Sequence, residues 1–229
     1  MQATAVRNIH RADAGAIAAL ERLGVSTVHE AQGRSGLMQP YLRPVWRGAR
    51  IAGSAVTALC HPNDNWMIHV AIELVKPGDV LVVACSSENT NGAIGDLIST
   101  SLKARGVKGV VIDMGCRDAA EIEQMKFPIW ARAISAQGTI KGTVGSVNLP
   151  VGCGGVHVNP GDVVVADDDG VVVVPRLDAA KVVKAGEERE KKEATNRQRL
   201  LKGELSLDIY DMRKALAEKG LKYVDGPLE

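Results

Sequence analysis

The alternation of hydrophobic and polar positions along the chain predicts a mixed α/β protein. Short runs rich in Val, Ile and Ala that are bounded by turn residues are typical of buried strands, and they lie at 49–59, 80–84, 109–113, 163–166 and 171–174. Apolar residues at helical spacing predict helices over 11–23, 65–75, 95–105 and 119–125. Glycines at 24 and 106 follow two of these helices and are expected to end them. The region 127–158, rich in Gly, Val, Thr and Ile, predicts several short strands.

The pattern changes after residue 176. Residues 178–202 are strongly charged and predict one long helix, and residues 206–219 predict a second, amphipathic helix. A charge run of this kind is usually a solvated helix face, although a long terminal helix can also reach over a neighbouring subunit. We therefore expect an α/β domain over 1–176 and a helical extension over 177–229.

Composition and charge exclude several classes of partner. Hydrophobic residues make up 45 % of the 229 residues but aromatic residues only 3 %, so the core must be built from Val, Ile, Leu and Ala. A net charge of +1 lacks the excess of positive charge that is typical of proteins that bind nucleic acid or an anionic membrane. No apolar run approaches the roughly 20 residues of a membrane span, and residues 1–12 lack the apolar segment of a secretory signal. We expect a cytoplasmic protein that binds neither nucleic acid nor membrane.

Candidate chemistry lies at two predicted turns between a strand and a helix. Arg117 and Asp118 follow the strand at 109–113, and Gly95 with Asp96 opens the helix at 95–105. An arginine offers a fork for a carboxylate, an aspartate offers a hard oxygen ligand for a divalent cation, and a helix start offers backbone N–H groups to an anion. The alternative for Arg117 and Asp118 is a surface ion pair at a helix start.

Other motifs in the chain are incomplete. His29-Glu30 begins like the zinc motif His-Glu-x-x-His, but position 33 is glycine. The glycines at 152–155 lack the order and the following helix of a dinucleotide fingerprint. Three acidic residues at 167–169, followed by Gly170 and placed between two Val-rich runs, predict a hairpin turn in preference to a metal site. The four cysteines are scattered and form no Cys-x-x-Cys pair.

Taken together, Gly95-Asp96-Leu97-Ile98 and Gly115-Cys116-Arg117-Asp118 resemble the metal-dependent pyruvate aldolases of the RraA-like family. The similarity extends over nearly the whole chain through five further motifs, which are Thr27–Ala31, Gly53–Thr57, Asp64–Trp66, Gly138–Lys141 and Pro160–Gly170. The resemblance implies an αββα sandwich of the swivelling β/β/α type with a C-terminal helical tail. It also implies a homo-oligomer, either a trimer or a dimer of trimers, in which the tail packs on a neighbouring subunit.

The resemblance also assigns expected roles to residues. A divalent metal, Mg²⁺ or Mn²⁺, would be held by Asp118, and no organic cofactor is expected. Arg117 would bind the pyruvyl part of a small oxo-acid substrate, and the backbone of the segment Gly95, Asp96, Leu97 and Ile98 would bind its carboxylate. Three acidic residues would contact metal-bound water: Asp96, Glu30 and Glu193. The last two would act across a subunit boundary.

The implied reaction is metal-dependent retro-aldol cleavage in the degradation of aromatic compounds. The substrates would be 4-hydroxy-2-oxo acids with two or three carboxylates, such as 4-carboxy-4-hydroxy-2-oxoadipate and 4-hydroxy-4-methyl-2-oxoglutarate, and the products pyruvate and a second oxo acid. Oxaloacetate presents the same fragment to the metal, so its decarboxylation is expected as a side activity. Ala93 and Ile94 stand where close aldolases carry bulky aromatic residues, which changes the expected entrance for the C4 substituents.

Three alternatives remain at the level of sequence. A Schiff-base aldolase would need a buried lysine, for which Lys141 is the candidate. The chain could instead be a protein-binding regulator of an RNA-degrading enzyme, as the family's namesake is, or primarily an oxaloacetate decarboxylase. A methyltransferase is not supported, because no strand is followed by a glycine-rich nucleoside loop with an acidic partner.

Overall fold

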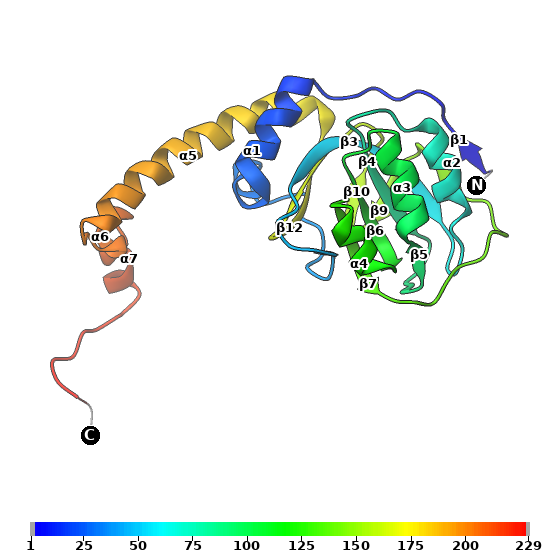
Figure 1. Ribbon diagram of the computed structural model, residues 1–229. Helices are drawn as coiled ribbons and strands as arrows, with labels where there is room; N and C mark the ends of the chain where they lie inside the picture. The colour runs from blue at the N-terminus through cyan, green and yellow to red at the C-terminus, as the bar shows by residue number, and fades with distance from the viewer. Residues whose placement is uncertain (1–2, 228–229) are drawn as a thin grey trace. The chain divides into compact units, whose positions relative to one another are not determined.

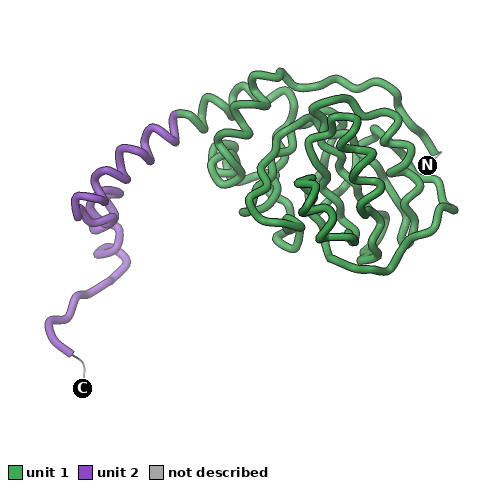
Figure 2. Tube along the Cα trace, in the orientation of Figure 1, with its two compact units in different colours: residues 1–187 green, residues 188–229 purple. Residues whose placement is uncertain are grey.

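The computed structural model describes residues 3–227. The chain divides into two compact units, Met1–Glu187 and Glu188–Glu229 (Figure 2). The first unit contains every strand and the candidate chemistry at Arg117 and Asp118. The second unit is helical. Each unit is described by itself.

Ten strands of the first unit form one mixed sheet, and two more form a separate hairpin. The strands are β1 (Thr4–Ala5), β2 (Arg43–Pro44), β3 (Ile51–Cys60), β4 (Val80–Cys85), β5 (Gly92–Ile94), β6 (Gly109–Cys116), β7 (Ile129–Ile134), β8 (Ser146–Val147), β9 (Val151–Cys153), β10 (Val156–Val158), β11 (Val163–Asp167) and β12 (Gly170–Val174). The central order is β1-β8-β3-β4-β6-β7-β2, with β3, β4, β6 and β7 parallel to one another. The short strand β5 pairs in parallel with β6, and β11 and β12 continue the sheet from the first half of β3.

Helices cover the sheet from opposite sides (Figure 1). They are α1 (Ala14–Ala31), α2 (Trp66–Leu74), α3 (Asp96–Ala104), α4 (Ala119–Gln124) and the first turns of α5 (Ala179–Leu201), the part of this helix that belongs to the first unit. A first apolar cluster joins α2, α3 and α4 to one face of β3, β4, β6 and β7. A second joins the other face of those strands to β9–β12, and a third joins β11 and β12 to α1 and the start of α5.

The alternation of side chains along β11 shows why these clusters make layers. Val164 and Ala166 pack into the cluster between the sheet regions, whereas Val163 and Val165 pack against α1 and α5. Successive strand residues point to opposite faces, so one Val-rich strand buries both of its faces. The order of the layers is therefore helix, sheet, sheet, helix. The predicted αββα fold with a long C-terminal helix is confirmed.

Gly24 has φ 77° and interrupts α1, as predicted, and the chain resumes as a helix to Ala31. Two local features differ from the sequence expectation. The stretch 92–94, where no strand was predicted, is the strand β5. The predicted single helix over 206–219 is wrong, because it divides into α6 (Ser206–Ile209) and α7 (Arg213–Glu218) at Asp211, which has φ 51°. The hairpin predicted at residues 167–170 is confirmed by the pairing of β11 with β12.

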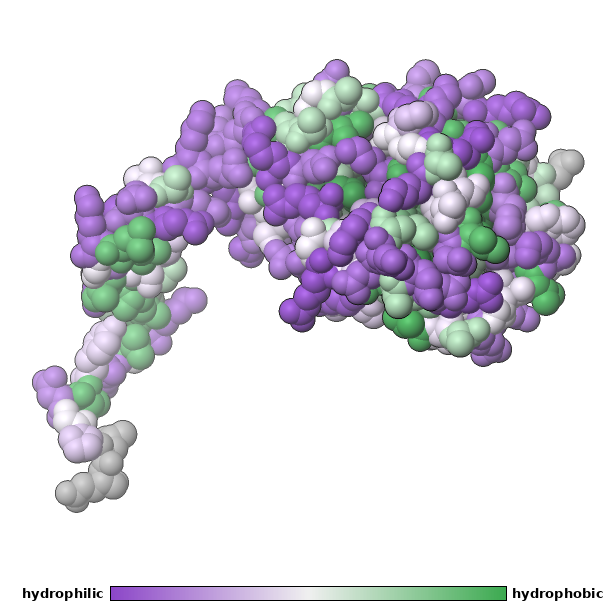
Figure 3. Space-filling model, in the orientation of Figure 1, coloured by the Kyte–Doolittle hydropathy of each residue, from purple (hydrophilic) through white to green (hydrophobic). Residues whose placement is uncertain are grey.

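The second unit exposes a group of apolar side chains around α6 and α7 (Figure 3). Its members are Leu200, Leu201, Leu205, Tyr210, Met212, Leu221, Tyr223 and Val224. None of the helices within residues 3–227 is both long and apolar enough to span a membrane. The predicted boundary of the helical extension at residue 177 stays a prediction.

Candidate functional site

The two strand-to-helix turns of interest meet at one edge of the sheet. Strand β5 leads through Gly95 into α3, and the parallel strand β6 leads through Arg117 and Asp118 into α4. The backbone N–H of Asp96 donates to Oδ2 of Asp118 at 3.1 Å. The backbone N–H of Arg117 donates to the carbonyl of Ile94 at 2.9 Å. Two segments that are 22 residues apart in sequence are therefore locked together by two hydrogen bonds.

Asp118 occupies an unusual backbone conformation. Its φ of 57° and ψ of 42° are left-handed, a region that aspartate tolerates better than most residues. The same carboxylate oxygen that accepts from Asp96 lies 3.6 Å from Nε of Arg117. Both side chains remain accessible, 47 % exposed for Arg117 and 34 % for Asp118. Arg117 and Asp118 thus form the surface ion pair of the alternative interpretation. Arg117 also lines a cavity, and Asp118 is joined to that lining through its hydrogen bond from Asp96.

Glycines allow this close approach. A Cβ atom on Gly95 would lie 2.3 Å from Oδ2 of Asp118 and 3.0 Å from Cγ of Arg117. A Cβ atom on Gly92 would lie 2.3 Å from the carbonyl oxygen of Ser135 and 3.1 Å from Cβ of Arg117. The shorter contact in each pair is one that real Cβ atoms do not make, so a side chain at Gly95 would displace the Asp118 carboxylate and one at Gly92 would displace the backbone at Ser135. The contacts with Arg117 would also be tight.

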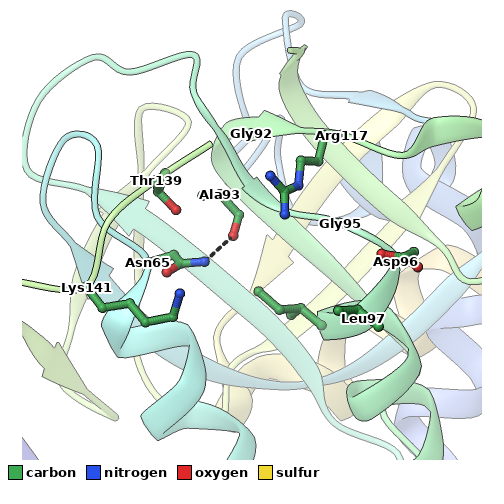
Figure 4. A pocket seen from close by; sticks show the side chains of 10 residues that line it. Asn65, Gly92, Ala93, Gly95, Asp96, Leu97, Arg117, Thr139 and Lys141 are labelled. Atoms are coloured by element: carbon green, nitrogen blue, oxygen red, sulfur yellow. Dashed lines mark hydrogen bonds between the residues drawn. The ribbon is translucent and has the colours of Figure 1, made fainter. Parts of the chain in front are cut away.

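A small cavity of about 70 Å³ opens at these turns (Figure 4). It is lined by Asn65, Gly92, Ala93, Gly95, Asp96, Leu97, Ile98, Arg117, Thr139 and Lys141. Its volume suits a few heavy atoms, which is one end of a small organic acid, and is small for a nucleotide. The lining contains the whole predicted segment 95–98 together with Arg117.

The opposite wall of the cavity was not predicted as part of the site. Figure 4 shows Asn65, Thr139 and Lys141 across the cavity from Asp96 and Arg117. Asn65 donates from Nδ2 to the carbonyl of Ala93 at 2.9 Å, which joins the start of α2 to β5. The motifs Asp64–Trp66 and Gly138–Lys141 are part of the family resemblance. That resemblance could have been used to predict that Asn65, Thr139 and Lys141 belong to the site.

Neither Cys116 nor Lys141 is prepared to act as a nucleophile. Burial, with a contribution from the nearby Asp118 carboxylate, raises the pKa of the Cys116 thiol to about 12, so Cys116 is not a thiolate near neutral pH. Lys141 is exposed, so it lacks the desolvation that prepares a lysine amine for Schiff-base chemistry. The site therefore offers cations, carboxylates and backbone donors in place of a covalent nucleophile.

Three predicted acidic residues are not among the residues that line the cavity. Asp118 is next to the lining, because its carboxylate accepts the N–H of Asp96. Glu30 lies near the end of α1, where its carboxylate accepts from Nε of Arg34 at 3.1 Å. Glu193 lies on α5 in the second unit and pairs with Arg189 at 2.8 Å. The resemblance placed Glu30 and Glu193 in the site of a neighbouring subunit, and that role stays a prediction.

The residues present are compatible with a hydrated divalent cation. Among residues 3–227 no group of three or more His, Cys, Asp or Glu side chains gathers closely enough to form a complete metal cage. Mg²⁺ usually keeps several waters and binds through one or two carboxylates plus substrate oxygens. The accessible carboxylate of Asp118, with Asp96 next to it and a cavity beside it, fits that second kind of site.

Comparison with known proteins gives one family. A family model described as RraA-like, Aldolase/RraA, matches residues 12–173. A Halalkalibacterium halodurans protein with the provisional name 4-hydroxy-4-methyl-2-oxoglutarate aldolase is 30 % identical over 65 % of this chain and 71 % of its own. A Burkholderia multivorans protein with the same provisional name is 34 % identical over 62 % of this chain and 87 % of its own.

Solved structures give the same fold. The crystal structure of Streptomyces coelicolor RraAS2, described as an unusual member of the RNase ES inhibitor RraA protein family, superposes with a TM-score of 0.74. It is 31 % identical and covers 83 % of this chain and 99 % of its own. The resemblance expected from the two turn motifs is thereby confirmed.

Proposed function

The chain belongs to the RraA-like family, and we propose that it cleaves 4-hydroxy-2-oxo acids to pyruvate and a second oxo acid with the help of a divalent cation. The observation that carries the proposal is the hydrogen bond from Asp96 N–H to Asp118, which joins the two turns beside one small cavity. Relatives that carry an aldolase name support the reaction class.

Arg117 and the start of α3 would bind the pyruvyl end of the substrate. The guanidinium of Arg117 offers a planar fork to a carboxylate. Leu97 and Ile98 lie in the first turn of α3, where N–H groups have no intrahelical partner and the helix dipole favours an anion. These donors line the same cavity, so they can fix one carboxylate in one orientation.

Asp118 would hold the cation, with water filling most of its other positions. When bound, the cation supplies Lewis-acid withdrawal of electrons from the 2-oxo group. In the cleavage, a water in the cavity would take the proton of the 4-hydroxyl group, and the O–H electron pair would form the carbonyl bond of the second oxo acid. The electron pair of the broken C3–C4 bond would move into the enolate of pyruvate. Arg117 stabilises the negative charge that develops there. Asp96, half-buried at the cavity edge, would orient the water that returns a proton to C3.

The test is pyruvate release from 4-hydroxy-4-methyl-2-oxoglutarate and from 4-carboxy-4-hydroxy-2-oxoadipate, with Mg²⁺ or Mn²⁺ and then with EDTA. We expect release that EDTA abolishes and that added cation restores. Asp118→Ala and Arg117→Ala should each lower kcat/KM by about a hundredfold or more. Asp178→Ala and Arg105→Ala remove the same charges from exposed positions outside the cavity and serve as controls. Full activity in either site variant contradicts the proposal.

Two further functions are separated by the same assay. Release of pyruvate from oxaloacetate alone would make decarboxylation the main activity at the same site. The likeness to a structure described within an RNase inhibitor family supports a protein-binding regulator as the second candidate. That candidate predicts no pyruvate release from any of the three substrates and no effect of Arg117→Ala on binding of an RNase.

A further inference from the structure

We propose that Cys60 and Cys85 are a redox-active pair, which hydrogen peroxide converts to a reversible disulfide bond between β3 and β4. This modification site lies outside the cavity and does not depend on the proposed aldolase reaction. The positions of the two cysteines in the sheet carry it.

The two cysteines are the last residues of neighbouring strands. β3 ends at Cys60 and β4 ends at Cys85, and the two residues are direct partners in the parallel register of these strands. Both side chains pack in the same apolar cluster, the one that joins the sheet to α2, α3 and α4, so they point to the same face. Neighbouring strands lie about 4.8 Å apart. This spacing is within the range of about 4.4–6.8 Å between the Cα atoms of two cysteines in a disulfide.

Hydrogen bonds hold the chain beside the pair in register. The backbone N–H of Ser86 donates to the carbonyl oxygen of Cys60 at 3.0 Å. The side chain of Ser86 also meets that of His61, with 3.1 Å between Oγ and Nδ1. The residues that follow the two cysteines therefore run side by side, and the two thiols stay neighbours in the folded protein.

The two thiols differ in their access to an oxidant. Cys85 is half-buried, whereas Cys60 is 1 % exposed, so a peroxide meets Cys85 first. Burial raises the pKa of the Cys85 thiol, although the N–H groups of Ser87 and Ser86 oppose that effect. Burial and the nearby Cys85 raise the pKa of Cys60 to about 12. Because only the thiolate reacts, the oxidation is slow at neutral pH and begins at Cys85.

The oxidation consists of two balanced steps. The thiolate of Cys85 attacks one oxygen of hydrogen peroxide, the O–O bond breaks, hydroxide leaves and Cys85 becomes a sulfenic acid. The thiolate of Cys60 then attacks the sulfenic sulfur, forms the S–S bond and displaces a second hydroxide. The protons that the two thiols lose convert both hydroxides to water. Two electrons thus pass from the two thiols to one peroxide.

The other two cysteines are not arranged in this way. Cys116 and Cys153 are fully buried. The register partners of Cys116 are Ile94 on β5 and Ile134 on β7, and the partner of Cys153 is Val156 on β10. Cys116 and Cys153 are therefore expected to stay reduced when Cys60 and Cys85 are oxidised.

A disulfide at this position would join the bases of two segments that lead to the cavity. Asn65, which lines the cavity, follows Cys60 by a few residues, and Gly92, which also lines it, follows Cys85 by a few residues. The oxidised protein would therefore carry a covalent tie between the two segments, and reduction would remove it.

The test treats reduced protein with excess hydrogen peroxide, blocks the remaining thiols by alkylation and maps the cysteines after digestion. Cleavage after glutamate places the four cysteines in four different peptides, which are 31–73, 74–88, 89–121 and 124–187. We expect the free thiols of the denatured protein to fall from four to two, because one disulfide uses two of them. Peptides 31–73 and 74–88 should be joined by a bond that dithiothreitol breaks.

Single variants separate the roles of the two thiols. Cys85→Ala removes the thiol that meets the peroxide, so loss of free thiols should be slower by about tenfold or more. In Cys60→Ala, Cys85 should stop at the sulfenic acid, which dimedone labels. Cys116→Ala is the matched control and should form the wild-type linkage at the wild-type rate. The melting temperature of each variant checks that it is folded.

Several results would overturn the proposal. They are four free thiols after treatment, a linkage that involves Cys116 or Cys153, a disulfide between two chains on a non-reducing gel, and oxidation of Cys85 to a sulfinic acid in place of a disulfide. A linkage of peptides 31–73 and 74–88 in a protein that releases no pyruvate would support the redox-active pair while the proposed function fails.

Discussion

Gly95 shows how a single missing side chain can hold the site together. Its φ of −144° is open to any residue, so the requirement for glycine comes from space. We predict that Gly95→Ala pushes the Asp118 carboxylate away from the N–H of Asp96, because the added Cβ would lie 2.3 Å from Oδ2. Pyruvate release should fall by about a hundredfold, and the free energy of unfolding should drop by about 1–3 kcal/mol.

Gly152→Ala is the matched control for that substitution. Gly152 is exposed, and a Cβ atom there would meet nothing within 4 Å. Activity and urea denaturation of the two variants can be measured side by side. Wild-type activity in Gly95→Ala would mean that the hydrogen bond between the two turns is not needed for the reaction.

Asp64 gives a prediction in pH. Burial of its carboxyl group opposes ionisation, but hydrogen bonds from the N–H groups of Trp66, Gly142 and Thr143 outweigh that effect and lower the pKa of Asp64. A lowered folded-state pKa stabilises the fold above the unfolded value of about 4, and this contribution is lost as the pH falls through the folded value. Asp64→Asn should therefore cost about 2–3 kcal/mol at pH 7.

The measurement is urea denaturation of wild-type protein and Asp64→Asn between pH 7 and pH 3. The difference between their unfolding free energies should narrow as the pH falls below about 4, because the Asp64 carboxyl of the unfolded chain then binds a proton before the folded carboxyl, whose pKa is lower, does. If the difference in unfolding free energy between the two proteins stays constant over this range, the stability lost in Asp64→Asn comes from altered packing and not from the charge of the carboxylate.

Half of the candidate site could be predicted from the sequence. Arg117 and Asp118 follow a clear buried strand and precede a helix, so their local order alone placed them at a sheet edge. Asn65 and Lys141 could not be placed in this way, because they are far apart in the chain and the hydrogen bonds of Asp64 and Asn65 bring them to one wall. The motifs that contain Asn65 and Lys141 were part of the family resemblance, but they did not show where in the fold these two residues lie.

At the scale of elements, the sequence pattern predicted those strands correctly in which valine is the dominant residue. The Val-rich runs at β4, β6, β11 and β12 are buried on both faces, and their composition was sufficient to predict them. The short strand β5 was missed because so short a segment carries no usable period, and it exists through its pairing with β6. The break between α6 and α7 was missed because Asp211 carries no strong helix-breaking signal.

Gly24 divides α1 and gives a prediction for that element. Its φ of 77° and ψ of 169° are unfavourable for a residue with a side chain, and an added Cβ would lie 3.0 Å from Oδ2 of Asp167. That oxygen accepts the N–H of Val25 at 2.9 Å, the residue that restarts the helix. Gly24→Ala should destabilise the protein by about 1–3 kcal/mol.

Gly33→Ala separates strain from crowding in that experiment. Gly33 has φ 76°, close to the value at Gly24, but a Cβ atom at Gly33 would meet nothing within 4 Å. The free energies of unfolding of both variants, from chemical denaturation, should fall, and that of Gly24→Ala should fall further because this substitution also disturbs Asp167. A loss in Gly24→Ala no larger than that in Gly33→Ala would contradict the added effect through Asp167.

At the scale of the whole molecule, the two units differ in how they are stabilised. All three apolar clusters consist of residues from the first unit. The second unit contributes none of them and exposes a group of Leu, Tyr, Met and Val side chains (Figure 3). Exposed apolar groups of this kind often mark protein contacts. They support the prediction that the helical extension packs on a neighbouring subunit.

Mixing of inactive chains tests whether Glu193 acts across that boundary. Asp118→Ala and Glu193→Ala are each expected to be inactive in the pyruvate-release assay. If a site combines Asp118 of one subunit with Glu193 of another, chains refolded together at random regain about a quarter of the wild-type sites. If both residues serve a site within one chain, every site in the mixture lacks one of them and no activity returns.

Two controls make that result decisive. Glu190→Ala changes a neighbouring acidic residue on α5 and, paired with Asp118→Ala, should only dilute wild-type activity. Sedimentation of each variant must show the same oligomer, because complementation requires shared contacts between subunits. Wild-type activity in Glu193→Ala alone would remove this residue from the reaction. The role of the helical extension would then be to assemble subunits through its exposed apolar side chains, and not to take part in catalysis.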